Sequence, residues 1–294
     1  MPDTYGILGL GNLGGGVAKC LLGKGVTLTG WDPLADKLAA FTAAGGKPGN
    51  GAAGVIQASD VVMLSLPSTA ALNSVVADVL AAGKPGQIVV ETSTLPLAVK
   101  EAARDRLAAK GIHMLDCTVS GAARQAETGT LAMQMSGDAA LCERIRPLVS
   151  GFTSSATYVG DFGMAIRLKL IINMMGAVLI ELTSEAFLLA EKAGVDKATF
   201  VDVINKSAVG SRMFEIRSHA MKAREYEDPK TMTAGLGIGV KDNHVIREFA
   251  ESLGAPLPLF NAAFPYFEAA MARGWAGRDI SCISEVLRAM AGAR

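Results

Sequence analysis

Short apolar runs alternate with helix-forming stretches through the first half of the chain. The apolar runs are bounded by polar or proline residues, a pattern typical of strands that are buried on both faces of a parallel sheet. We expect strands at residues 26–31, 61–66, 88–91, 113–116 and 131–135, after a first strand that ends at Leu8. Strands that alternate with helices in this way predict an α/β fold.

The pattern changes near residue 163. From Met164 to about Glu191 the chain consists almost entirely of helix-forming residues, and the rest of the sequence is also helical in character. We therefore expect an α/β domain at residues 1–163 and an all-α domain at residues 164–294. The second domain begins with a long interdomain helix.

The most apolar part of this long helix is too short to cross a membrane. Residues 170–180 are strongly apolar, but charged residues interrupt the stretch well below the roughly 20 apolar residues that a membrane span needs. These charged residues are Arg167, Lys169, Glu181 and Glu185. We expect a helix that is buried inside protein and no interaction with a membrane.

Composition and charge exclude several other classes. The chain has 294 residues, of which 50% are hydrophobic, and is therefore long enough to bury a large core. Lys+Arg and Asp+Glu both number 28, so a net charge of zero gives no general attraction to nucleic acid. The four cysteines are scattered without C-x-x-C spacing and no charged-then-apolar leader precedes the first strand, which predicts a cytoplasmic protein. The three histidines are isolated, so we expect no metal site.

A glycine-rich turn follows the first expected strand. Gly9, Gly11 and Gly14, with Asn12 and Leu13 between them, form a G-x-G-x-x-G pattern where a helix begins. The first glycine permits a tight turn, the second lets the backbone approach a pyrophosphate, and the third lets the helix pack against the strand. Because a helix and a second strand follow in the required order, the pattern predicts a Rossmann-type dinucleotide-binding domain rather than an ordinary βαβ turn.

Asp32 stands at the end of the second expected strand, close to the usual spacing of about 20 residues after the glycine-rich turn. A carboxylate there accepts hydrogen bonds from ribose hydroxyls and repels a 2′-phosphate. We therefore expect NAD as the cofactor rather than NADP. The alternative is that Asp32 opens a turn with Pro33, and both roles can hold at once.

Two other strand ends carry candidate cofactor contacts. Leu66 and Pro67 follow one strand and Thr94 follows another. Ligands of open α/β sheets lie beyond the carboxyl ends of the strands, so we expect these residues to contact the cofactor. The alternative is an ordinary loop, because the same residue types are common there.

Lys169 and Asn173 are polar residues in an apolar part of the long helix. They stand at positions i and i+4 and therefore project from one face. Burial disfavours the charged form of a lysine, so Lys169 is a candidate general acid for a proton transfer near neutral pH. The alternative is that Lys169 reaches the surface and Asn173 only links two helices.

Four parts of the chain, in this order, resemble signatures of the β-hydroxyacid dehydrogenases, a family that includes 3-hydroxyisobutyrate dehydrogenase and tartronate semialdehyde reductase. The resemblance covers essentially the whole chain. The matching parts are 9–14 with Ser93 and Thr94, 116–121 followed by Gly129, 159–163 leading to Lys169 and Asn173, and Lys241 with Asp242. The resemblance implies that these parts hold, in turn, the cofactor, the substrate, the catalytic lysine and a Lys-Asp pair of the C-terminal domain.

The resemblance also implies a role for individual residues. Lys169 is the catalytic lysine, and Asn173 orients it and the substrate. The substrate-binding residues are Ser120, Gly121, Ala122 and Lys241, of which Ser120 and Gly121 hold the carboxylate and Lys241 also lies near the nicotinamide. In a hydride transfer, the lysine moves the proton of the reacting hydroxyl.

The chain departs from the family pattern at several positions. Thr118 stands where a proline is usual, and Ala165 stands where a glycine is usual. Ala122 and Ala123 follow Gly121 where relatives have a second glycine, and Ile172 replaces one of two paired asparagines. We expect these changes to affect the shape of the substrate pocket more than the hydride chemistry.

These observations predict an NAD-dependent dehydrogenase that acts on a small 3-hydroxy carboxylic acid. Residues 211–215 look more like members that act on polyhydroxylated acids such as threonate, with Arg212 facing a second polar group or serving as a surface cation. The alternatives are an imine reductase-like enzyme and a noncatalytic module that senses a dinucleotide. The apolar helical domain and the resemblance also predict a homodimer or homotetramer.

Overall fold

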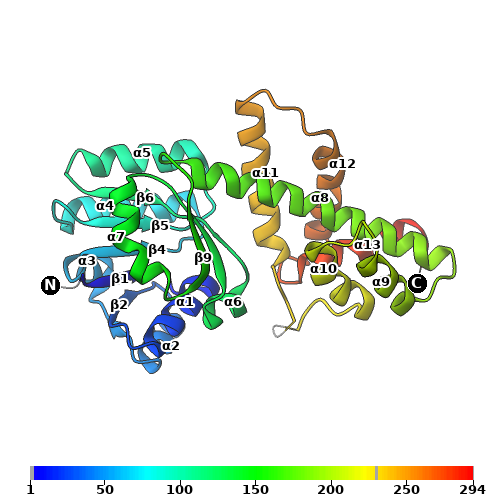
Figure 1. Cartoon of the computed structure of the whole chain (residues 1–294), viewed down its shortest axis with the longest axis horizontal. Coiled ribbons are helices and arrows are strands. Elements are labelled where there is room, and N and C mark those ends of the chain that lie inside the picture. The colour runs from blue at the N-terminus through cyan, green and yellow to red at the C-terminus, as the bar shows by residue number, and fades with distance from the viewer. Residues whose placement is uncertain (1–2, 229–230, 294) are drawn as a thin grey trace. The chain divides into compact units, whose positions relative to one another are not determined.

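The computed structural model describes residues 3–228 and 231–293, and the chain divides into two compact units (Figure 1). The first unit ends at Lys169 and the second begins at Leu170. The first unit is an α/β domain and the second is all helical, as the hydrophobic pattern predicts.

A six-stranded parallel sheet forms the centre of the first unit. Its strands lie in the order β3-β2-β1-β4-β5-β6, with the glycine-rich turn after the central strand β1. The strands are β1 (Tyr5–Leu8), β2 (Leu28–Trp31), β3 (Lys47–Pro48), β4 (Val61–Leu64), β5 (Ile88–Glu91) and β6 (His113–Asp116). This strand order places the reversal between β1 and β4, where ligands of doubly wound sheets bind.

Strands β2 and β4 are each two residues shorter than the sequence predicts. The amide of Val26 bonds to the carbonyl of Leu21 at the end of helix α1 (Asn12–Gly23) rather than to a neighbouring strand. The amide of Leu66 bonds to the side chain of Ser93. Both residues are apolar, but Val26 precedes the first residue of β2 and Leu66 follows the last residue of β4.

Alternate residues of the buried strands point into two separate cores. Val61 and Met63 pack with α1 and with α6 (Ala123–Thr128) and α7 (Ala139–Val149), whereas Val62 and Leu64 face the opposite side. The helices on that opposite side are α3 (Gly51–Gln57), α4 (Thr69–Ala82) and α5 (Leu97–Ala108). Phe41 of α2 (Ala35–Ala43) joins the first core. Burial on both faces explains why these strands read as continuous apolar runs.

Residues 131–135 form a strand, but in a second sheet. This sheet contains β7 (Val119–Ser120), β8 (Leu131–Met135) and β9 (Thr153–Tyr158), in that order. Strand β8 is antiparallel to β7 and parallel to β9. The apolar run therefore identified the strand, while its placement in the main parallel sheet was wrong.

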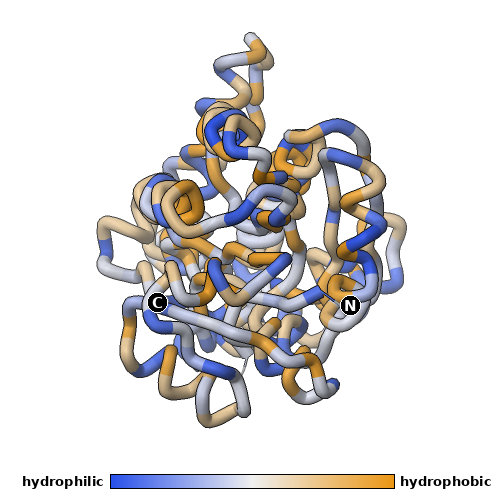
Figure 2. Tube along the Cα trace, turned by 90° about the vertical axis from the view of Figure 1, so that its left-hand side faces the viewer, coloured by the Kyte–Doolittle hydropathy of each residue, from blue (hydrophilic) through white to orange (hydrophobic). Residues whose placement is uncertain are grey.

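The part of the second unit that the structure describes is helical, with one isolated β-bridge between Gly235 and Asp279. The long helix α8 (Met164–Lys192) matches the predicted interdomain helix closely. Along the Cα trace of the chain, hydrophobic and hydrophilic residues are interspersed (Figure 2). The other elements are α9 (Lys197–Lys206), α10 (Arg212–Ala223), α11 (Leu236–Ser252), α12 (Pro258–Ala272), a short 3₁₀ helix (Ile280–Ile283) and α13 (Ser284–Met290). Among the described residues, no helix combines the length and apolar character needed to span a membrane.

Candidate active site

The glycine-rich turn has the geometry that a dinucleotide requires. Gly9 has a φ of +91°, and a Cβ there would lie 2.2 Å from the carbonyl oxygen of Ser65. A Cβ on Gly14 would lie 2.0 Å from the carbonyl oxygen of Gly9, so the helix and the strand approach more closely than any side chain allows. A Cβ on Gly11 would meet no atom within 4 Å. The space beside Gly11 and the first amides of α1, which begins at Asn12, fit a pyrophosphate.

Asp32 holds this turn in place. One carboxylate oxygen accepts a hydrogen bond from the amide of Leu10 at 2.7 Å, and the other accepts one from the amide of Leu34 at 2.9 Å. The residue is only 8% exposed. Asp32 therefore fixes the turn that Pro33 begins, and its carboxylate retains acceptor capacity for further donors, because each oxygen has two lone-pair sites.

The loops that follow β4 and β5 are joined through Ser93. Its hydroxyl accepts a hydrogen bond from the amide of Leu66 at 2.8 Å, while the hydroxyl of Thr92 donates to the carbonyl of Leu64 at 2.7 Å. Pro67 is exposed and Thr94 is partly buried beside this junction. The predicted cofactor-contacting segments thus lie together at the carboxyl edge of the sheet.

Lys169 lies in the second turn of α8, next to the segment that follows β6. Its ammonium donates a hydrogen bond to the hydroxyl of Ser120 at 3.3 Å, and the lysine side chain is partly buried. Gly121 follows Ser120 and has a φ of +135°. A Cβ on Gly121 would lie 2.6 Å from the side chain of Leu131. The backbone therefore turns at a place that only glycine accommodates readily.

The amide of Ala122 has an intramolecular partner. It donates to the side-chain oxygen of Gln125 at 2.8 Å, at the start of α6. A substrate carboxylate would compete with Gln125 for this amide. Ser120 and the lysine beside it are therefore the better donors for an anionic group in this segment.

Asn173 and Lys241 meet the same carboxylate in the second unit. The amide nitrogen of Asn173 donates to one oxygen of Asp242 at 2.9 Å, and the ammonium of Lys241 lies 2.9 Å from the other oxygen. Asp242 is 8% exposed, whereas the Lys241 side chain is 36% exposed. Asp242 thus orients both residues, a role that the sequence analysis did not assign to it.

Sequence models of two protein domains match the chain. Residues 4–160 match the NAD-binding domain of 6-phosphogluconate dehydrogenase, and residues 163–287 match the NAD-binding domain of NADP-dependent 3-hydroxyisobutyrate dehydrogenase. An L-threonate dehydrogenase of Cupriavidus necator is 32% identical over 97% of this chain and 96% of its own length. The chain belongs to the β-hydroxyacid dehydrogenase family.

Other members of the family agree in length and fold. An NAD-dependent L-serine dehydrogenase of Pseudomonas aeruginosa is 28% identical over 95% of this chain and 96% of its own. The structure of a Mycobacterium tuberculosis 3-hydroxyisobutyrate dehydrogenase with L-serine is 26% identical, with a TM-score of 0.89 over 98% of this chain and 100% of that one. This β-hydroxyacid dehydrogenase is thus an oxidoreductase built to use a nicotinamide dinucleotide.

Arg212 and His244, one of the three histidines, pair with side chains outside the set of predicted site residues. Arg212 is 78% exposed and pairs with Glu215 at 2.6 Å. His244 lies 3.0 Å from a carboxylate oxygen of Glu268 and packs edge-on against Phe264 of α12. Among residues 3–228 and 231–293, no group of three or more His, Cys, Asp or Glu side chains could hold a metal ion.

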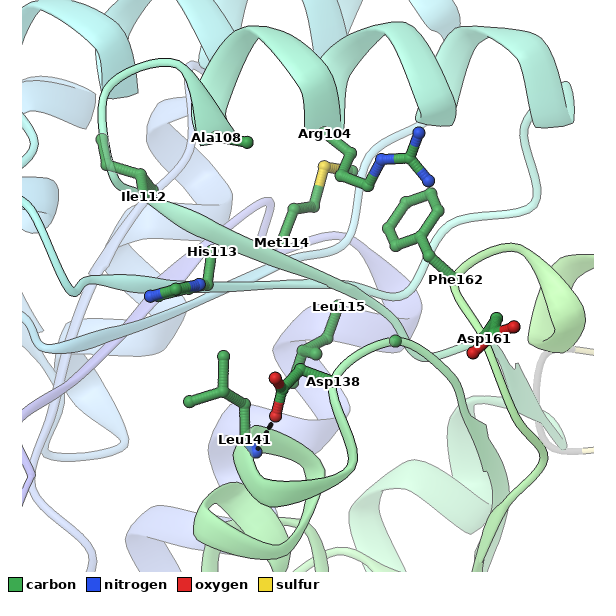
Figure 3. Close-up of a pocket in the computed structure, with 11 residues that line it drawn as sticks. Arg104, Ala108, Ile112, His113, Met114, Leu115, Asp138, Leu141, Asp161 and Phe162 are labelled. Carbon is green, nitrogen blue, oxygen red and sulfur yellow. Dashed lines mark hydrogen bonds between the residues drawn. The ribbon is translucent and has the colours of Figure 1, made fainter.

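A hollow of about 340 Å³ lies within the first unit of this dehydrogenase (Figure 3). It borders the start of the edge strand β6 and includes Arg104, His113, Asp138 and Phe162. The guanidinium of Arg104 lies 4.9 Å from the centre of the Phe162 ring. None of the predicted site residues lines this hollow.

Proposed function

We propose that the chain is an NAD-dependent dehydrogenase of small 3-hydroxy carboxylic acids, with Lys169 as general acid and base. The observation that carries this proposal is the 3.3 Å hydrogen bond from the Lys169 ammonium to Ser120. This bond joins Lys169, in the second turn of α8, to the segment that resembles the substrate-binding signature. Asn173 follows one turn later on the same helix.

The proposed chemistry requires one proton to move together with a hydride. When bound, the nicotinamide accepts the hydride from the alcohol carbon or returns it to the carbonyl carbon. Lys169 takes the hydroxyl proton in oxidation and supplies it in reduction. In reduction its positive charge also stabilises the negative charge that develops on the carbonyl oxygen.

The substrate class rests on donors in the first unit and on the relatives' names. Ser120 and Lys169 together present a hydroxyl and an ammonium, which suit a carboxylate beside a hydroxyl group. Threonate, serine and 2-(hydroxymethyl)glutarate, after which relatives are named, all have a hydroxyl on the carbon β to a carboxylate. A polyhydroxylated acid such as threonate is the leading candidate.

The preference for NAD rests on Asp32. Its carboxylate is held by two backbone amides at the carboxyl end of β2, where a ribose hydroxyl can reach it. The same fixed negative charge opposes a 2′-phosphate. We infer that NAD binds more tightly than NADP.

The experiment that tests this function measures NADH absorbance with a panel of acids that includes threonate, glycerate, serine and 3-hydroxyisobutyrate. We expect turnover with at least one acid and a loss of about 10²–10⁴-fold in kcat/KM for Lys169→Ala, with the Kd for NAD little changed. Unchanged turnover in Lys169→Ala would reject the role of the lysine. Cofactor binding without turnover of any acid would favour a dinucleotide-sensing module.

We also propose that the protein is a homodimer or homotetramer. Large apolar side chains repeat at helical spacing along the exposed side of α8, namely Ile171, Met175, Leu182 and Leu189, which are 46%, 55%, 57% and 72% exposed. A continuous exposed apolar stripe favours association. Light scattering at micromolar concentration tests this, and Leu182→Glu should shift the mass toward the monomer. A monomeric parent protein would refute the proposal.

A further inference from the structure

An ammonium group lies completely buried between two carboxylates in the first unit. Lys100 of α5 lies 2.6 Å from Glu91 and 2.7 Å from Asp116, and all three side chains are 0% exposed. Burial by itself would lower the pKa of Lys100, but the attraction of Asp116 and Glu91 outweighs it and raises the pKa. The ammonium of Lys100 therefore stays charged between the two carboxyl groups.

Such a cluster is poorly explained by stability alone. Buried ion pairs repay their desolvation only with good geometry, and well-packed apolar residues of similar volume often serve as well. What apolar residues cannot do is accept hydrogen bonds from the backbone. Both carboxylates of this cluster use their remaining oxygen in that way.

Asp116 uses its remaining oxygen to hold the first turn of α8. That oxygen accepts a hydrogen bond from the amide of Ile166 at 2.8 Å. Ser136 supports the same turn, because its hydroxyl accepts from the amide of Ala165 at 3.1 Å and donates to Asp116. The first amides of a helix have no partner within the helix and carry a partial positive charge, so a carboxylate there binds strongly.

Glu91 holds the cofactor side of the domain. Its remaining oxygen accepts from the amide of Ser93 at 2.8 Å, and the hydroxyl of Ser93 in turn accepts from the amide of Leu66. These are the loops after β4 and β5 that we expect to contact the cofactor. Lys100 thus lies at the middle of a continuous chain of bonds from these loops to the start of α8.

We propose that Lys100 is a positioning residue, which with Glu91 and Asp116 fixes the start of α8, and hence Lys169, relative to the cofactor loops. This inference rests on the proposed function of Lys169. Lys169 is three residues beyond Ile166, so a displaced first turn displaces the lysine by a similar distance. A hydride transfer is sensitive to displacements of about 1 Å, which can cost about 10²-fold in rate.

The test compares two variants of buried residues on the same helix. Lys100→Met removes the ammonium, and Leu107→Ala, also 0% exposed on α5, damages the apolar core without touching the cluster. At a temperature where both are folded, we expect kcat to fall about tenfold or more in Lys100→Met and to change less than about twofold in Leu107→Ala. Equal kcat values in the two variants would overturn the proposal.

A milder variant decides the matter if Lys100→Met does not fold. Ser136→Ala removes the hydroxyl between Asp116 and Ala165 and leaves the three charges in place. We expect a smaller fall in kcat, of about threefold or more, with an unchanged Kd for NAD. Full activity in Ser136→Ala would contradict the role proposed for the hydrogen bonds from Asp116 and Ser136 to the first turn of α8.

Hydrogen exchange separates this inference from the proposed function. In Lys100→Met and Ser136→Ala, but not in Leu107→Ala, the amides of residues 165–169 should exchange about tenfold faster. If no acid is turned over but hydrogen exchange changes as expected, the proposed function fails, while the proposal that the Lys100 cluster fixes the start of α8 is supported. If hydrogen exchange at residues 165–169 is unaltered, the proposal for the Lys100 cluster is refuted even if the enzyme is active.

Discussion

The hydroxyl of Thr118 donates a hydrogen bond to the carbonyl oxygen of Ala165 at 3.1 Å. Thr118 and Ala165 are two of the positions where the sequence departs from the pattern that the family resemblance implies, a proline at the first and a glycine at the second. A proline has no hydroxyl to donate, so this link between the segment after β6 and the first turn of α8 depends on the threonine. The two departures thus occur at one point of contact.

Thr118→Val should show what this link contributes. Valine has nearly the same shape but no hydroxyl, and Thr118 is 0% exposed, so we expect the free energy of unfolding to fall by about 1 kcal/mol. We also expect kcat to fall, because the bond acts on the turn that precedes Lys169. Urea denaturation and steady-state kinetics measure the two effects.

Thr183→Val is the matched control for this prediction. Thr183 is 4% exposed and its hydroxyl donates to the carbonyl of Leu179 within α8, away from the start of the helix. We expect a similar loss of stability and unchanged kcat. A kcat that falls equally in both variants would mean that the Thr118 bond has no specific effect on the site.

Asp32 should control the choice between NAD and NADP. Asp32→Asn retains an oxygen that can accept from a backbone amide but removes the negative charge. We therefore expect the ratio of the Kd for NADP to the Kd for NAD to fall by about tenfold. Asp36→Asn, which removes an exposed charge at the start of α2, should leave the ratio unchanged. Calorimetry gives both constants, and equal affinities in the parent protein would contradict the assignment.

Glu181 should make stability depend on pH. Burial, with a smaller effect of Glu185, raises its pKa from 4.5 to about 8. Between these values the unfolded chain releases the proton while the folded protein keeps it, so the free energy of unfolding falls as pH rises and levels off above about pH 8. Each unit of pKa difference corresponds to at most about 1.4 kcal/mol.

Glu181→Gln tests this pH dependence. The neutral amide does not titrate, so we expect the variant to be more stable than the parent at pH 9 and to change less between pH 5 and pH 9. Glu185→Gln should give only a small part of this gain, because burial is the larger cause. Identical pH profiles for the parent and Glu181→Gln would show that Glu181 is charged in the folded protein at pH 7.

Asp242 should link Asn173 to Lys241. An asparagine at 242 can keep one of its two partners but not both, because its nitrogen donates rather than accepts. We expect Asp242→Asn to lose about 1 kcal/mol of stability, since Lys241 is partly exposed, and to lower kcat about tenfold. Asp202→Asn, which removes an exposed partner of Lys206, should change neither. Normal kcat in a folded Asp242→Asn variant would argue against an orienting role.

The sequence predicts the strands that carry an apolar run and misses the strands that are polar or very short. Strands β4 and β5 are buried at every position, and their apolar runs identify them. Strand β9 reads Thr153–Tyr158 with mostly exposed polar side chains, so no hydrophobic pattern marks it. Strands β3 and β7 have two residues each, too few for any periodicity.

The candidate site shows the same limit. The glycine-rich turn is a local pattern, and its geometry follows from the sequence. The Lys100 cluster joins residues of α5, β5 and β6, and in the sequence Lys100 looks like any charged residue of an amphipathic helix. Asp242 was visible only as half of a Lys-Asp pair, and its contact with Asn173 spans 69 positions of the chain. Contacts of this kind depend on tertiary packing, which periodicity does not encode.

Because α8 runs without a break from Met164 to Lys192, helix geometry alone sets the angle between Lys169 and Asn173. Adding or deleting a single residue between them would rotate one relative to the other by about 100°, onto different sides of the helix. Substitutions at the three intervening positions leave this angle intact. In related sequences this stretch should therefore vary in residue type but keep a constant length.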